Sequence, residues 1–188
     1  GLVQAYGQRH AFLRMLGDAP QALRFLTHFL GLGPYFARVL IAAPEWLDLF
    51  AKPELIEVPT TASELMAELA PITDEQLFMT RLRRLRTREV LKAGIRHHAG
   101  LIDWPTLFEE FSVVADGLVQ AAANFVAKQM GLPAYGVQSC ALAMGKWGSG
   151  ELGFFSDLDV IWIYQSQSGA GEHEQQQMER WVAEILRV

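Results

Sequence analysis

A glycine-rich stretch in the last quarter of the chain, 145-GKWGSGELGFFSDLD-159, limits the possible folds more than any other segment. It lies between two short apolar runs, 138-QSCALAMG-145 and 160-VIWIY-164. Runs of this length, bounded by glycine or polar residues, predict two buried β-strands joined by the glycine-rich loop. Small residues beside paired carboxylates do not suit a hydrophobic core. The stretch is therefore either a glycine turn with two surface aspartates or the entrance to a phosphate-and-metal site.

The two aspartates favour the second interpretation. If the second strand covers 157–164, its period of two places Asp157 and Asp159 on one face, with side chains projecting the same way. Such carboxylates can converge on a hard cation such as Mg²⁺, which also removes their mutual repulsion. Gly148 allows close approach of a phosphate to the backbone, and the Ser149 hydroxyl adds a donor. The residue types predict Asp157 and Asp159 as catalytic metal ligands beside a phosphate cradle.

The remaining polar residues of the loop have less specific roles. Ser156 is grouped with Gly148 and Ser149 as a nucleotide-binding candidate, and a backbone hydrogen bond from it is expected to order the loop. Lys146 either contacts phosphate or stays solvated beside the turn. Glu151 is expected to cap a turn, not to act as a ligand. Cys140 falls in the first predicted strand, where it is expected to be buried and inert.

Residues 1–132 carry apolar side chains at helical spacing, which predicts helices joined by short loops. The long helix in this region is expected to end near His98, and the last one at Gly131, a residue suited to the left-handed turn after a helix. A flexible connector, 165-QSQSGAGE-172, is expected after the second strand. Three helix starts have the composition of a capping box: Thr61 with Glu64, Thr73 with Gln76, and Thr106 with Glu109.

The segment 173–188 predicts an amphipathic helix, because its apolar residues form one stripe at helical spacing. The stripe consists of Met178, Trp181, Val182, Ile185 and Leu186.

Seven of the sixteen lysine and arginine residues cluster on the long helix. They form either a solvated face, or a surface that pairs with acidic segments or lies near the nucleotide. His97 and His98 follow directly, but adjacent residues point in different directions on a helix, so they are assigned no metal. The seven are Arg81, Arg83, Arg84, Arg86, Arg88, Lys92 and Arg96.

Composition narrows the function classes. Of 188 residues, 51% are hydrophobic, enough for a sizeable core, and the net charge of −5 argues against a general nucleic-acid binder. A single cysteine excludes an internal disulfide and fits a reducing compartment. No secretory signal is evident, and no run approaches the roughly 18 apolar residues of a membrane span. We expect a cytoplasmic protein without nucleic-acid or membrane partners.

Glycine and serine followed by Asp-x-Asp on a strand is the arrangement of the nucleotidyltransferase superfamily that includes DNA polymerase beta. The longer string GKWGSGELGFFSDLDVIWIY resembles the motif Gly-Lys-Leu-Gly-Gly-x-Glu-Leu-(Gly/Asn)-(Phe/Tyr)-x-Ser-Asp-(Leu/Ile)-Asp of the glutamine synthetase adenylyltransferase family. LRRLRTREVLKAGIRHHAG, FEEFSVVADGLVQAA and GPYFARVLIAAPEWLDLF are similar to further segments of that family. Trp147 stands where the motif has leucine, Ser149 where it has its second glycine, and Phe155 where it has a small residue.

The resemblance implies an α+β fold. An all-α helical domain would cover 1–135, and 136–188 would be the first part of a polymerase-beta-like nucleotidyltransferase α/β domain. The family's third metal carboxylate lies in a downstream strand of type Asp-x-Arg-Leu-Arg-Pro, which this chain does not reach. We therefore expect a fragment that is catalytically incomplete by itself.

The resemblance also implies a reaction. Family members use Mg²⁺, with ATP as substrate. One catalytic half attaches AMP to a tyrosine of glutamine synthetase, and the other half removes it by phosphorolysis. The two reactions together control nitrogen assimilation. Glu-Leu-Gly and Ser-Asp-Leu-Asp resemble the attaching half, whereas Arg-x-Arg-Glu and Ala-Asp resemble the removing half; the balance slightly favours attachment. Expected partners are glutamine synthetase and a nitrogen-signalling regulatory protein. The alternative is a non-catalytic helical interaction module that keeps the motif as a relic.

Overall fold

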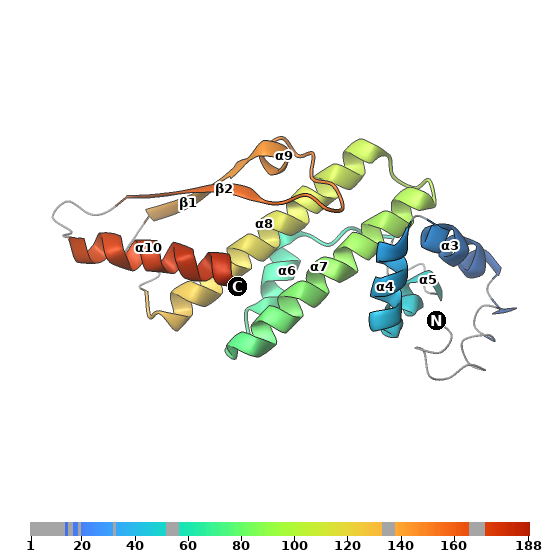
Figure 1. Ribbon diagram of the computed structural model, residues 1–188, viewed down its shortest axis with the longest axis horizontal. Coiled ribbons are helices and arrows are strands. Elements are labelled where there is room, and N and C mark those ends of the chain that lie inside the picture. Colours follow the sequence, from blue (N-terminus) through green and yellow to red (C-terminus); the bar gives the residue numbers. More distant parts are fainter. Residues whose placement is uncertain are drawn as a thin grey trace. The chain divides into compact units, whose positions relative to one another are not determined.

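The structure, a computed structural model, describes residues 14, 17–18, 20–31, 33–51, 57–132, 138–165 and 172–188 (Figure 1). They form a mostly helical chain with one small antiparallel sheet, consistent with the α+β class. Two compact units are present: Gly1–Pro59 with Arg88–Leu107, and Thr60–Thr87 with Phe108–Val188. The domain boundary expected at residue 135 stays a prediction, and the connector expected at 165–172 falls mainly outside the described residues.

The first unit is built from short helices and parts of two long ones. Proline at the start of α4 and of η1 fixes a helical φ and has no N–H to leave unsatisfied. Phe29 and Phe36 pack with ring centroids 4.5 Å apart at its centre. The elements are α3 (Pro20–Gly31), α4 (Pro34–Ala42), η1 (Pro44–Leu47), α5 (Asp48–Ala51), the end of α7 (Glu75–His98) and the start of α8 (Trp104–Gln129).

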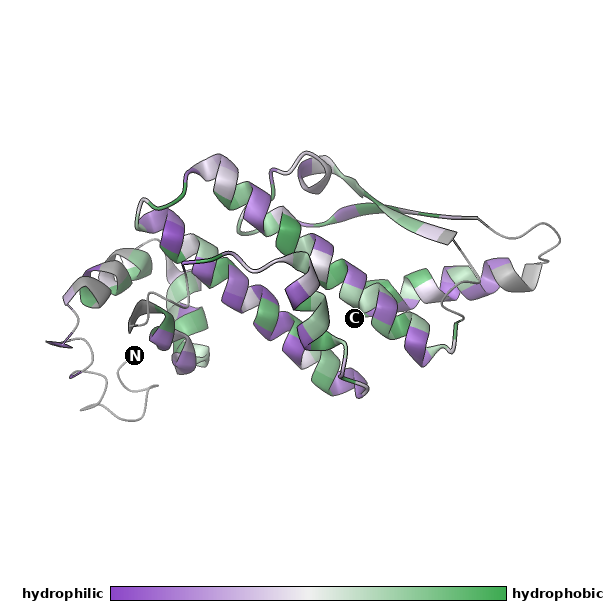
Figure 2. Ribbon diagram, turned by 180° about the vertical axis from the view of Figure 1, so that it is seen from behind, coloured by the Kyte–Doolittle hydropathy of each residue, from purple (hydrophilic) through white to green (hydrophobic). Residues whose placement is uncertain are grey.

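The second unit contains the predicted loop and its surroundings. Its core joins α6 (Ala62–Leu69), α7, α8 and α10 (Glu172–Arg187) with side chains of the sheet. Hydrophilic and hydrophobic residues alternate along these helices, as expected for helices with one buried face (Figure 2). In the α10 stripe, Met178, Trp181 and Ile185 are buried, but Leu186 is 69% exposed, so its assignment to the buried stripe was wrong.

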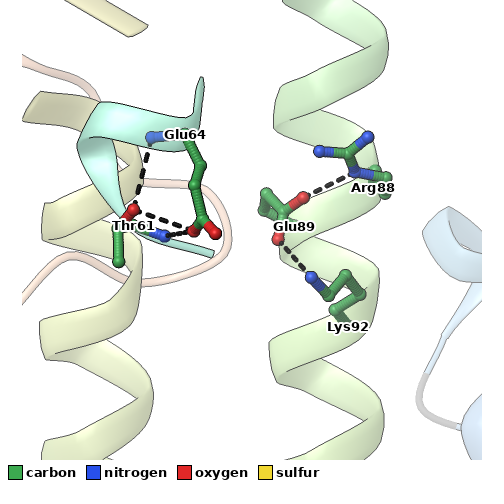
Figure 3. A network of polar contacts seen from close by, with 5 residues as sticks. All are labelled: Thr61, Glu64, Arg88, Glu89 and Lys92. Carbon is green, nitrogen blue, oxygen red and sulfur yellow. Dashed lines mark hydrogen bonds and ion pairs between the residues drawn. The ribbon is translucent and has the colours of Figure 1, made fainter. Parts of the chain in front are cut away.

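One of the three predicted capping boxes is confirmed. The Thr61 hydroxyl accepts from the Glu64 N–H at 3.2 Å, while the Glu64 carboxylate accepts from the Thr61 N–H at 2.8 Å (Figure 3). Together these bonds satisfy two backbone donors at the start of α6.

The other two helices begin on aspartates, so the predictions for Thr73 and Thr106 were wrong. Asp74 Oδ1 accepts from the Leu77 N–H at 2.7 Å, and Asp103 Oδ1 accepts from the Thr106 N–H at 3.0 Å. An aspartate caps better than a threonine because its charge also suits the positive end of the helix dipole. At the other end of α8, Gly131 adopts a φ of 64°, and the predicted stop there is confirmed.

The sheet is smaller and more open than the sequence predicted. Strands β1 (Gln138–Met144) and β2 (Asp159–Gln165) pair antiparallel, with Met144 opposite Asp159. Trp162 and Tyr164 pack against the core, but Ile161 and Ile163 on the other face are 49% and 53% exposed. Burial on both faces was therefore wrong for the described chain, because its helices cover one face only. Cys140 is likewise exposed, which corrects its assignment to the core.

The basic cluster divides into two parts along α7. Arg81, Arg83, Arg84 and Arg86 are exposed, as a solvated face requires. Beyond Thr87 the helix becomes buried and includes an ion-pair cluster, shown with its contacts in Figure 3. Glu89, 4% exposed, lies 2.6 Å from Arg88 Nε and 3.0 Å from Lys92 Nζ.

Among the described helices, none combines the length and apolar character needed to cross a membrane.

Replacing Glu89 with alanine removes the carboxylate that Arg88 and Lys92 contact in a buried setting. We expect the free energy of unfolding to fall by about 3 kcal/mol, because Lys92, whose side chain is only 10% exposed, loses an anionic partner in a buried setting. Arg83→Ala, on the exposed part of the same helix, is the control and should change it by less than about 0.5 kcal/mol. Urea unfolding followed by far-UV circular dichroism measures both. Equal, small effects would show that the cluster is solvated.

A second prediction concerns the start of α8. Hydrogen bonds from the Thr106 hydroxyl and then from its N–H lower the pKa of Asp103 below the ordinary value of 3.8. A lowered pKa means that the cap stabilises the fold fully above the unfolded-state pKa, and that this contribution is lost as the pH falls through the folded-state value. The melting-temperature difference between the parent chain and Asp103→Ala should be constant from pH 8 to about pH 5 and shrink below about pH 4. A difference that grows with acid would contradict the cap.

Candidate functional site

The strand register brings the two ends of the glycine-rich loop together. Because Met144 pairs with Asp159, the loop leaves β1 and returns to β2 at the same end of the sheet. Gly145, the first loop residue, has a φ of 54°, and a Cβ there would lie 2.7 Å from Asp159 Oδ2. Only glycine suits this position, because it tolerates the left-handed backbone and leaves room for the carboxylate.

The short helix α9 (Gly145–Gly148) folds back against β1. A Cβ on Gly148 would overlap the carbonyl oxygen of Ala143, so the close approach of these two backbones requires glycine. The Glu151 N–H closes the turn on the Lys146 carbonyl at 2.7 Å. A backbone capping role for Glu151 agrees with the expectation for that residue.

Ser149 and Ser156 both make hydrogen bonds within the loop. The Ser149 N–H donates to Gly145 O at 3.1 Å, so its hydroxyl is the group it can turn toward a ligand. That hydroxyl lies 3.1 Å from Glu151 Oε2 and 3.3 Å from Lys146 O. Ser156 Oγ accepts from the Gly153 N–H at 2.9 Å, the loop-ordering bond expected of it.

The loop is anchored to α8 through its large side chains, which sequence reasoning missed. Trp147, 6% exposed, donates from Nε1 to Asp116 Oδ1 at 2.9 Å. Phe154 packs edge-on against Phe111 of the same helix, with centroids 5.0 Å apart, and Leu152 is buried. The available signal was the presence of bulky apolar residues among glycines, since such residues in a loop need a surface to cover them.

The two aspartates lie at the end of this anchored loop, and both are exposed. Asp159 is the first residue of β2, whereas Asp157 precedes the strand, which begins two residues later than predicted. The argument that a shared strand face aligns them therefore does not hold. Within the described ranges, no group of three His, Cys, Asp or Glu residues is placed to hold a metal ion. Asp157 and Asp159 remain the candidate pair because carboxylate oxygens are what Mg²⁺ takes from proteins.

A cleft of about 740 Å³ lies elsewhere, between α8, the sheet and α10. Gln120, Asn124 and Lys128 line one wall, while Trp162 and Trp181 line another; neither Asp157 nor Asp159 faces it. The cleft thus lies apart from the proposed ligands. It meets the loop only at the Trp147–Asp116 contact, because both of those residues belong to its lining.

Comparison with known proteins decides the family. The model of the glutamate-ammonia ligase adenylyltransferase family matches residues 23–187, most of the chain. The chain belongs to this family. Curated bifunctional glutamine synthetase adenylyltransferase/adenylyl-removing enzymes are similar to it. The enzyme of Methylococcus capsulatus is 29% identical, over 87% of this chain and 19% of the relative. The enzyme of Mycobacterium leprae is 30% identical, over 96% of this chain and 18% of the relative.

The chain spans about a fifth of the length of the relatives it matches. The enzyme of Mycolicibacterium smegmatis, 28% identical, shows the same proportion, with 94% of this chain and 18% of the relative covered. The family match extends over both compact units, so the helices and the glycine-rich loop belong to one family segment.

The close packing of α9 on β1 gives a test of the loop geometry. We expect Gly148→Ala to lower the free energy of unfolding by about 1–3 kcal/mol, because its Cβ meets the backbone of Ala143 and cannot be relieved by a side-chain rotation. Gly153→Ala is the matched control, since a Cβ there would lie 3.6 Å from Ser156 Oγ, an ordinary contact. Urea unfolding followed by tryptophan fluorescence compares the two. A Gly148→Ala variant as stable as its control would show that α9 is not packed on β1.

Proposed function

We propose that this chain forms part of an adenylyltransferase active site that acts on glutamine synthetase, with ATP as the source of AMP. Membership of the glutamate-ammonia ligase adenylyltransferase family carries the proposal. The arrangement of the loop supports it, because the glycines hold Ser149 and the exposed Asp159 at the same end of the sheet. The relatives' names include adenylyltransferase and adenylyl-removing activities, so both directions are considered.

The residues have distinct roles in this proposal. Asp157 and Asp159 fit Mg²⁺, since this ion is usually bound through one or two carboxylates together with substrate phosphates. When bound, it would neutralise charge that develops on the transferring phosphoryl group. Gly148 belongs to the phosphate cradle in this proposal by keeping α9 against Ala143, and the Ser149 hydroxyl beside it donates to the phosphate. Ser156 contributes by holding the loop before Asp157 through its bond to Gly153.

In the attaching direction, a tyrosine hydroxyl oxygen of glutamine synthetase attacks the α-phosphorus of ATP. The bond to the pyrophosphate oxygen breaks, and the hydroxyl proton leaves to solvent or a base. In the removing direction, an oxygen of inorganic phosphate attacks the phosphorus of the AMP on tyrosine. The bond to the tyrosine oxygen breaks, that oxygen takes up a proton, and the AMP is released joined to phosphate as ADP. We favour attachment for this chain because its loop contains the sequences Glu-Leu-Gly and Ser-Asp-Leu-Asp, which resemble the attaching half. Transfer of label from α-labelled ATP to glutamine synthetase, against phosphate-dependent release of labelled ADP, distinguishes the two.

The decisive variant is Asp159→Asn in a protein of the relatives' full length that carries this chain. Asparagine keeps the size of the side chain but removes one anionic ligand, so the rate of transfer should fall on the order of 100-fold, about 3 kcal/mol of barrier. The melting temperature in metal-free buffer should be unchanged or higher, because neutralising one of two neighbouring carboxylates relieves repulsion. The measurements are the initial rate of label transfer and a thermal melt.

The control is Glu109→Gln, which neutralises an exposed carboxylate on α8. Its rate of transfer should stay within about twofold of the parent, as for ordinary surface changes. Full activity in Asp159→Asn would rule out the metal assignment. A collapsed fold in that variant would show instead that Asp159 is structural.

A further inference from the structure

Ring packing and a hydrogen bond both join the glycine-rich loop to α8. Phe154 meets Phe111 through ring packing, while Trp147 meets Asp116 through a hydrogen bond of 2.9 Å. The two α8 residues are five apart, about 7.5 Å along a helix axis. The loop is thus held at two separated places on one rigid element, which restricts its rotation as well as its distance from α8.

The Trp147–Asp116 bond has the chemistry of a specific lock. The indole has one polar atom, a donor, and Trp147 is buried, so its N–H needs a protein acceptor. The acceptor is a carboxylate on an exposed residue, and a hydrogen bond to an ionised group is stronger than one between neutral groups. Phenylalanine at 147 could fill the same space but could not make this bond.

The position of Trp147 in the chain connects this lock to the proposed phosphate cradle. It directly precedes Gly148, whose backbone lies against Ala143 with no room for a side chain. Ser149 follows, its N–H donating to Gly145 O and its hydroxyl donating to Glu151 Oε2. A shift of the indole would therefore move the backbone that carries Gly148 and Ser149.

We propose that Asp116 is a positioning residue for the nucleotide loop: by binding Trp147 Nε1, it fixes the placement of Gly148 and Ser149. This inference rests on the proposed adenylyltransferase function for its catalytic consequence, but not for the lock itself. Asp116 touches neither candidate metal ligand in this arrangement and acts only through Trp147. Its effect should therefore appear in the binding of ATP more than in the chemical step.

The first test measures the Trp147–Asp116 hydrogen bond and does not require enzyme activity. In ¹⁵N-labelled chain, the Trp147 indole N–H signal, identified by its loss in Trp147→Phe, should shift and exchange faster with solvent in Asp116→Ala. The backbone amide signals of Gly148 and Ser149 should move with it. Gln120→Ala, one turn further along α8 and bonded to Asn124, is the control and should leave all three signals in place. Unmoved Gly148 and Ser149 amides in Asp116→Ala would overturn the proposal.

The second test measures the catalytic consequence in a protein of the relatives' full length. We expect Asp116→Ala and Trp147→Phe each to raise the KM for ATP about tenfold while kcat changes less than about threefold, as for loss of one charge-assisted hydrogen bond. Asp116→Asn keeps an oxygen acceptor and should restore KM to within about threefold of the parent. The double variant should be no worse than Trp147→Phe alone, because both changes remove the same bond.

The outcomes separate the two proposals. If Asp116→Ala changes neither the amide signals of Gly148 and Ser149 nor the KM for ATP, Asp116 does not position the loop. Amide shifts with an unchanged KM would restrict the bond to a structural role and would also overturn the positioning proposal. A parent protein that neither labels glutamine synthetase nor releases labelled ADP from it would refute the proposed function, and the amide signals would still decide whether Asp116 holds the loop.

Discussion

The packing of the sheet and α10 on one face of α8 is the constraint on which the candidate site depends. Trp181 on α10 donates to the Ala123 carbonyl of α8 at 3.2 Å and stacks edge-on with Trp162 of β2, 5.3 Å between centroids. These contacts fix β2, and therefore its first residue, Asp159, relative to α8. The same helix then receives the loop through Asp116 and Phe111. One helix thus sets the position of both the strand and the loop that together present the candidate ligands.

The opposite side of α8 shows why this helix can serve as a platform. Gly117 faces α6, and a Cβ there would come within 2.9 Å of Ala62 Cα. The absence of a side chain brings the two helices into close backbone contact, while Leu65 and Leu69 of α6 are almost completely buried. A helix packed closely on one side moves little when a loop binds its other side, because well-packed interiors resist deformation.

Much of this arrangement could be predicted from local sequence rules. The helical spacing, the stop at Gly131 and the two strands are properties of neighbouring residues, and so is the cap at Thr61. The helix starts at Asp74 and Asp103 were missed because threonine and aspartate compete for the same backbone donors, and the geometry decides between them. The open face of the sheet was missed for a different reason. Alternation along β2 shows that Ile161 and Ile163 share a face, but not which faces are covered by other elements.

The site divides in the same way. Asp159 and Gly148 were chosen from residue type alone, because the chemistry of a metal and a phosphate limits the residues that serve them, and their roles stay predictions. Trp147 and Asp116 lie 31 positions apart and meet only after α8 and the sheet have packed. A long-range pair of this kind leaves no periodic signal in one sequence. The loop therefore combines two sets of residues with opposite needs: Asp157 and Asp159 stay exposed, whereas Trp147 and Leu152 are buried, although Phe155 in the same loop is 69% exposed. Because these sets are interleaved over fifteen positions, the burial of one set fixes where the other is presented, and the glycines supply the backbone conformations that allow both.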